Sequence, residues 1–210
     1  MHATSEEKRL FVLRNHALIA FNSVIEICEQ VIDKPIPPSD PLYHPLMIAL
    51  YIAYGRPFTK CWGYGKLPED SIPTKFRKLH DVLISHRNKI YAHADKDMTH
   101  EDYGPANELR VTVGRDGQCR CWTQPVQPTP LRVKDILTLA REMHRKMEYW
   151  TDRFVNQHMM KMDVEPGDYL VNTESETDLL TRRDAEQVKR ERLRGRRAVS
   201  RYGTPEAPQA

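Results

Sequence analysis

The sequence of 210 residues predicts an all-α protein: a helical bundle of about four core helices, with a small β-hairpin insertion and a charged C-terminal tail. Apolar residues recur every three or four positions over several long stretches, as on one face of a helix. Two short segments of alternating character flank a turn between two of these stretches. After Pro166-Gly167 the sequence becomes polar and charged. We therefore expect a helical domain at residues 1–165 and a tail at 166–210 that is flexible or ordered by a partner.

The first predicted helix covers residues 5–33. Thr4 and Glu7 have the spacing of a capping box, in which each side chain binds the backbone of the other residue. Apolar residues then follow at helical spacing, namely Leu10, Leu13, Ala17, Phe21, Val24, Cys28 and Val31. Several prolines between Lys34 and Pro41 end this helix.

A shorter apolar helix is predicted from about Leu42 to Tyr54, with Pro45 tolerated in its first turn. From Gly55 to Pro73, glycine, proline and aromatic residues alternate, which indicates a structured loop. Trp62 and Tyr64 in this loop suit either packing or stacking on nucleic-acid bases, and packing is the ordinary role.

The central stretch of the sequence is LHDVLISHRNKIYAHADKD, within a helix predicted from about Pro73 to Asp95. In a helical projection with Leu83 as reference, an apolar stripe lies within about 40° and consists of Phe76, Leu79, Ile90 and Ala94. Arg87 lies at about +40°, His86 at about −60° and His93 at about −80°, so polar groups border or enter the apolar face. Such groups need partners, and ion pairs or helix caps inside the bundle are the ordinary solution.

A β-hairpin is predicted from residues 108–113 and 118–123, which flank a Gly-Arg-Asp-Gly turn. Cys119 and Cys121 in this hairpin lack obvious third and fourth ligands, so we expect reduced thiols and no metal site, with a structural zinc as the alternative. The last core helix begins at Thr129-Pro130 and ends near Met162. Its buried side is marked by Val133, Ile136, Leu137, Ala140, Met143, Met147, Trp150 and Phe154.

The tail is acidic in its first part. It is basic from Arg182 to Arg201, where Lys and Arg outnumber Asp and Glu. Thr173 and Glu176 have capping-box spacing, which favours a helix over residues 174–194 with few apolar side chains to dock it. The basic segment suits RNA phosphates, a protein partner such as an antitoxin, or the second subunit of a dimer. A solvated charged tail is the ordinary alternative.

Composition bounds the class of protein. The net charge of +3 is too small to indicate nucleic-acid binding on its own, so an RNA site must come from local charge. The sequence contains no run of about 18 apolar residues and no signal-peptide pattern. We therefore expect a soluble, cytoplasmic protein with no membrane partner and no cofactor.

The segment from His86 to Asp95 contains Arg87-Asn88 and Ala92-His93. It resembles the signature of the HEPN superfamily (higher eukaryotes and prokaryotes nucleotide-binding), whose motif is Arg, four to six residues, then His. The Asn after the Arg and the ending Ala-His-x-Asp resemble the abortive-infection, phage-defence branch of that superfamily. The close match covers residues 86–95, and beyond it the resemblance is one of architecture, with long helices before and after the motif.

The resemblance implies metal-independent cleavage of RNA at a site formed where the motif helices of two subunits meet in a homodimer. Arg87 would bind the scissile phosphate and stabilise its developing charge, which suits a permanently charged, bidentate group. His93 would take a proton from the ribose 2′-OH or give one to the leaving oxygen, because imidazole titrates near neutral pH. Asn88 would orient the phosphate or the catalytic pair.

Three further residues are candidate substrate-binding positions. Lys89, one turn before His93, is placed to bind phosphate or to act on His93 through its charge, and His86 to support Arg87 or the substrate. Asp95 would hold His93 or end the helix. The second role arises because side chains two positions apart on a helix point about 160° away from each other. Some members of the family carry at this position a Tyr that a partner nucleotidyltransferase modifies, and the sequence departs from that form of control.

We therefore expect an RNA endonuclease of the toxin or phage-defence kind. Because the sequence shows no credible metal site or protein nucleophile, attack by the ribose 2′-OH is expected to leave a cyclic phosphate. One alternative is a non-catalytic helical module, in which Arg87 and His93 bind nucleotide or RNA or merely hold a dimer. Another is a nucleic-acid-binding regulator, although the sequence shows no recognition-helix pattern.

Overall fold

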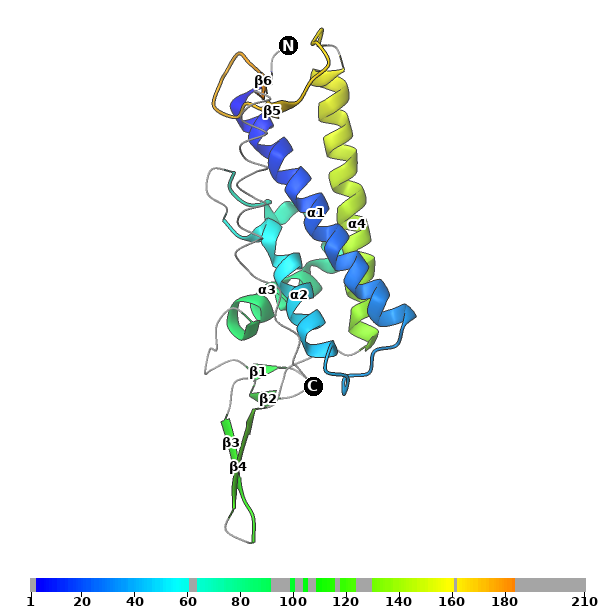
Figure 1. Cartoon of the computed structure of the whole chain (residues 1–210), viewed down its shortest axis with the longest axis vertical. Helices are drawn as coiled ribbons and strands as arrows, with labels where there is room; N and C mark the ends of the chain where they lie inside the picture. Colours follow the sequence, from blue (N-terminus) through cyan, green and yellow to red (C-terminus); the bar gives the residue numbers. More distant parts are fainter. Residues whose placement is uncertain are drawn as a thin grey trace, which may run out of the picture.

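Two long helices lie side by side along most of the molecule, and two shorter helices pack on one side of them (Figure 1). This computed structural model describes residues 3–60, 64–91, 99–100, 104–105, 109–115, 118–123, 130–160 and 162–183. The α-helices within these ranges are α1 (Ser5–Asp33), α2 (Tyr43–Gly55), α3 (Arg77–His86) and α4 (Pro130–Phe154). The chain is thus mostly helical, as the sequence predicts.

Helix α1 begins and packs as expected. Thr4 Oγ1 accepts a hydrogen bond from the Glu7 amide at 3.2 Å, and Glu7 Oε2 accepts one from the Thr4 amide at 2.8 Å, so the capping box is confirmed. Its buried side faces α2 and α4 and consists of Leu13, Ala17, Ala20, Phe21, Val24, Cys28 and Val31.

The length and composition of α1 also meet the requirements for crossing a membrane. The core helix of a soluble protein passes the same test, and α1 contributes its apolar side to the bundle core. A cytoplasmic location stays a prediction.

Helix α2 is the most buried of the shorter helices. Tyr43, Met47, Leu50, Tyr51 and Tyr54 have no exposed surface. The described residues between α2 and α3 include three short 3-10 turns, which are η1 (Arg56–Phe58), η2 (Glu69–Ser71) and η3 (Thr74–Phe76). Leu67 and Ile72 from this connection are buried in the core, so packing is the role of much of it.

Helix α4 carries the predicted apolar face with small differences. Val133, Ile136, Ala140, Met143 and Met147 are buried as expected. Leu139 is buried as well, although it was not among the residues predicted for the buried side, while Trp150 is only half-buried. The helix continues into the π-helical turn η5 (Val155–Met159), so it ends close to the predicted position.

The strands form three antiparallel pairs in the described part of the chain. They are β1 (Thr99–His100) with β2 (Gly104–Pro105), β3 (Leu109–Val113) with β4 (Cys119–Thr123), and β5 (Tyr169–Val171) with β6 (Leu180–Arg182). The β3–β4 hairpin confirms the predicted insertion and projects from one end of the bundle (Figure 1). Val111 and Val113 are exposed on it, and so are Cys119 and Cys121.

The predicted helix beginning at residue 174 is wrong over the described residues. The β5–β6 hairpin takes its place. The side-chain oxygen Oδ1 of Asn172 accepts hydrogen bonds from the backbone amides of Glu174 and Ser175, at 3.1 and 2.9 Å, and these bonds turn the chain. Leu179 is buried beside Ala3 and Phe154, which docks the hairpin on the bundle. Residues 184–210, most of the predicted basic segment, lie outside the described residues.

Lys8 on α1 holds the same hairpin. Its side chain is 1 % exposed, and Nζ donates to the backbone oxygens of Ser175 at 2.6 Å and Asp178 at 2.7 Å. A buried ammonium is stable only with such acceptors. The first part of the predicted tail is therefore bound to the start of the helical bundle.

Candidate functional site

The motif segment is not one uniform helix, in contrast to the helix predicted over 73–95. It begins with the 3-10 turn η3, continues as α3, and changes at Arg87 into the π-helical turn η4 (Arg87–Tyr91). π-Helical turns are rare, and they often occur at functional sites. The motif Arg is the first residue of the turn, and η4 contacts α2.

Arg87 is half-buried, and its side chain crosses α2 where that helix ends. A Cβ atom placed on Gly55 would lie 3.0 Å from Arg87 Cγ and 3.2 Å from Cδ, so a larger residue there would require the arginine stem to shift by a few tenths of an ångström. The stem of Arg87 is therefore fixed by packing. This role of Gly55 could not be predicted from the sequence, because a glycine at the end of an apolar helix is common.

The guanidinium of Arg87 has an unusual set of contacts. Nη1 donates to the side-chain oxygen of Asn88 at 2.8 Å. Nε is buried without a hydrogen-bond partner, and no carboxylate among the described residues forms an ion pair with the group. A salt bridge inside the bundle is the ordinary role for such an arginine. Arg87 forms none with the carboxylates of the described residues. The charge is held in place and is uncompensated by a described carboxylate.

His86 lies on the inner side of the turn. It is 4 % exposed, and its Nδ1 lies 3.3 Å from the Tyr51 hydroxyl of α2. The two rings also contact each other, with centroids 5.7 Å apart. His86 thus anchors the motif turn on α2, and its predicted contact with substrate stays a prediction.

Another buried pair joins α3 to α2 below the turn. The Tyr54 hydroxyl lies 2.8 Å from His80 Nδ1, and the ring of Phe58 packs edge-on against His80 with centroids 4.5 Å apart. Burial lowers the pKa of His80, so the neutral imidazole is favoured and Nδ1 can accept a hydrogen bond from the Tyr54 hydroxyl. This neutral pair fixes α3, the helix that leads into the turn carrying Arg87.

The remaining predicted site residues fall into two groups. Asn88 and Lys89 are exposed on η4 beside Arg87. His93 and Asp95 lie outside the described residues, so the geometry between Arg87 and His93 stays a prediction. Within the described part of the chain, no group of three His, Cys, Asp or Glu side chains is arranged to hold a metal ion.

Comparison of the chain with models of known protein families, with curated proteins and with solved structures found no match.

Proposed function

We propose that the protein is a metal-independent RNA endonuclease of the toxin or phage-defence type, with a HEPN-like bundle and a composite Arg/His site in a homodimer. The observation that carries the proposal is the state of Arg87. Its stem is fixed against Gly55, and none of the described carboxylates pairs with its guanidinium. An arginine held in this way is suited to a ligand anion such as a scissile phosphate.

The chemical roles follow from the side chains in the motif. Arg87 binds the phosphate and stabilises the charge that develops on its oxygens. His93 takes the proton from the ribose 2′-OH or supplies one to the 5′ leaving oxygen, and two subunits provide two such histidines. The 2′-oxygen bonds to phosphorus as the bond to the 5′-oxygen breaks, which leaves a 2′,3′-cyclic phosphate and a 5′-hydroxyl.

The neighbouring residues have supporting roles in this proposal. Asn88 accepts a hydrogen bond from Arg87 Nη1, which orients the guanidinium. Lys89 is exposed on the same turn and adds positive charge for the RNA backbone. Asp95 orients His93 or ends the helix, and the basic segment beyond residue 183 engages RNA or a partner protein such as an antitoxin.

The experiment is cleavage of a mixed RNA pool that includes tRNA, in EDTA, by wild type, Arg87→Ala and His93→Ala. Lys78→Ala is the matched control, because Lys78 is an exposed cation on α3, the helix that precedes the motif turn. Light scattering establishes that all four proteins have the same oligomeric state.

The proposal predicts that wild type and Lys78→Ala cleave the pool, while each motif variant is at least about a hundredfold slower. Equal rates for all four proteins would contradict it. RNA binding that Arg87→Ala abolishes, without cleavage by wild type, would instead support the non-catalytic binding module.

A further inference from the structure

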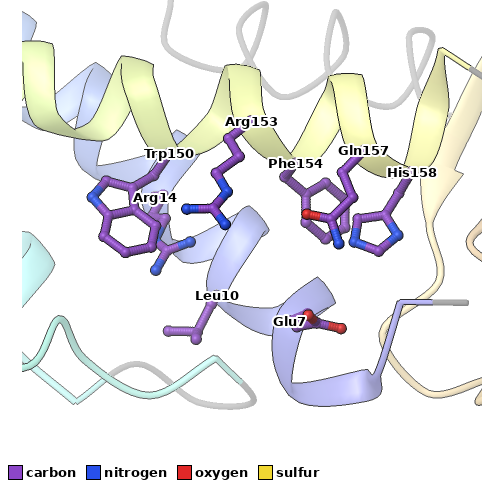
Figure 2. Close-up of a pocket in the computed structure, with 8 residues that line it drawn as sticks. All are labelled: Glu7, Leu10, Arg14, Trp150, Arg153, Phe154, Gln157 and His158. Carbon is purple, nitrogen blue, oxygen red and sulfur yellow. The ribbon is translucent and has the colours of Figure 1, made fainter. Parts of the chain in front are cut away.

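A second cationic site lies between α1 and α4, away from the motif turn. Its pocket has a volume of about 350 Å³. We call it the α1–α4 pocket, and its polar and aromatic lining consists of Glu7, Arg14, Trp150, Arg153, Phe154, Gln157 and His158. Figure 2 shows the side chains of α4 pointing toward α1, with the guanidinium groups of Arg14 and Arg153 at one end of the pocket.

Arg14 is fixed in this pocket by an aromatic ring. Its guanidinium carbon lies 4.3 Å from the centroid of Trp150, at cation–π distance. Burial lowers the pKa of Arg14, because part of the hydration of its charge is lost. No carboxylate of the described residues compensates for that loss through an ion pair.

Arg153 brings a second positive charge to the same pocket. It is exposed on α4 and likewise has no ion pair with a described carboxylate. Two guanidinium groups at one pocket repel each other unless an anion lies between them. The arrangement therefore favours an anionic ligand.

The single carboxylate in the lining does not serve as that anion. Glu7 Oε2 is bound by the Thr4 amide at 2.8 Å and the Thr4 hydroxyl at 3.1 Å, as part of the capping box of α1. The hydrogen bond from the Thr4 backbone lowers the pKa of Glu7, so the carboxylate is ionised but committed to the helix end. Figure 2 shows Glu7 at the end of the pocket away from the two guanidinium groups.

His158 lies at the end of the pocket away from the two guanidinium groups (Figure 2). It is 9 % exposed, and its Nδ1 is buried without a hydrogen-bond partner. Its ring is held by Phe154, with centroids 4.8 Å apart, and Phe154 stacks on Phe11 at 4.3 Å. Because this nitrogen is buried and the ring is held by Phe154, His158 forms part of the packed wall of the pocket.

We propose that the α1–α4 pocket binds a phosphate monoester, with Arg14 and Arg153 on the phosphate oxygens. A phosphate monoester has enough acceptor oxygens for two planar guanidinium forks and a further donor. The exposed amide of Gln157 adds another donor at the same wall. The pocket volume lies at the lower end of the range of about 300 to 1,000 Å³ for small-molecule sites, so it suits a phosphate group carrying a small substituent or a nucleoside.

The test is isothermal titration of the full chain with inorganic phosphate, AMP and acetate at constant ionic strength. The variants are Arg14→Gln and Arg153→Gln. The matched control is Arg145→Gln, because Arg145 is on α4 but is not part of the pocket lining, and its Nε donates to the Arg141 backbone oxygen at 3.4 Å. Thermal unfolding checks each variant, and Arg153→Gln keeps the test decisive if loss of the half-buried Arg14 impairs folding.

We expect both phosphate compounds to bind wild type and Arg145→Gln, and each pocket variant to bind about tenfold or more weakly. Similar affinities for phosphate and AMP would assign binding to the phosphate group alone, whereas tighter binding of AMP would add a contact with the nucleoside. The proposal is overturned if neither phosphate compound binds wild type, if acetate binds equally well, or if Arg145→Gln weakens binding as much as the pocket variants. None of these residues lies on α3 or η4, so this inference does not rest on the proposed nuclease.

Discussion

Two π-helical turns, η4 after α3 and η5 after α4, each carry a buried nitrogen without a hydrogen-bond partner. In η4 it is Arg87 Nε, and in η5 it is His158 Nδ1. The first turn packs on the main core through α2, whereas the second is covered by a small cluster of Ala3, Phe154 and Leu179. The two candidate sites therefore differ in how firmly the fold holds them.

The largest expected difference is in stability. Leu83→Ala, beneath the motif turn, should lower the free energy of unfolding by about 2 to 5 kcal/mol, because Leu83 has no exposed surface in the main core. Leu179→Ala should cost about 1 to 2 kcal/mol, because its cluster is small and near the surface. Urea unfolding of both variants measures this, and equal losses would contradict the proposed difference between the two regions.

The next effect concerns the attachment of the β5–β6 hairpin over η5. Lys8→Ala removes two charge-assisted hydrogen bonds to the hairpin backbone and should cost about 1.5 to 3 kcal/mol. Arg9→Ala is the control, since the 3.7 Å pair of Arg9 with Glu174 is solvent-exposed and worth less than about 1 kcal/mol. Hydrogen exchange at the amides of Asn172 and Arg183 should accelerate in Lys8→Ala only. Unchanged exchange there would mean that Lys8 does not hold the hairpin.

A smaller change in stability should separate packing from function at the motif turn. Gly55→Ala forces the Arg87 stem to move, while alanine favours the helical backbone, so the free energy of unfolding should change by less than about 1 kcal/mol. The rate of RNA cleavage should nevertheless fall about tenfold, because Arg87 is displaced. Gly167→Ala is the control, since the nearest atom to its Cβ would be Tyr169 Cε2 at an ordinary 3.5 Å. Equal cleavage by both variants would argue against a role for the position of Arg87.

The smallest effect is the pH dependence contributed by His80. Burial lowers its pKa in the folded state, so below about pH 6.5 the unfolded chain binds a proton that the folded chain does not. Stability from this group is therefore complete above the unfolded pKa and decreases as the pH falls toward the folded pKa. His80→Gln should show a shallower loss of stability between about pH 7 and pH 5 than wild type. Identical slopes in the two proteins would contradict this assignment.

The helices and the β3–β4 hairpin could be predicted because their signals are local. The Thr4–Glu7 capping box and the apolar spacing of α1 lie within a few residues of the structure that they specify. The spacing of Thr173 and Glu176 was equally local but misleading, because Asn172 turns the chain and the distant Lys8 binds that turn. Local propensity was overridden there by tertiary contacts.

The two candidate sites also differ in whether their residues are close together in the sequence. Arg87 and Asn88 are neighbours in a recognisable motif, so the sequence alone singled them out. The fit of Arg87 against Gly55 joins two helices, and the α1–α4 pocket joins Arg14 with Arg153 near opposite ends of the described chain. Each of those residues has an ordinary role on a solvated helix face when viewed alone, which is why only the packed structure brings them together.

The most direct test of the central claim uses one RNA that the wild type cleaves, together with the same RNA carrying a single 2′-deoxynucleotide at the cleavage position. In EDTA, we predict that wild type cleaves only the all-ribose substrate and leaves a 2′,3′-cyclic phosphate, and that Arg87→Ala and His93→Ala cleave neither. Cleavage of the deoxy-substituted RNA at the wild-type rate, or full activity of either variant, would contradict a site in which Arg87 and His93 promote attack by the ribose 2′-OH.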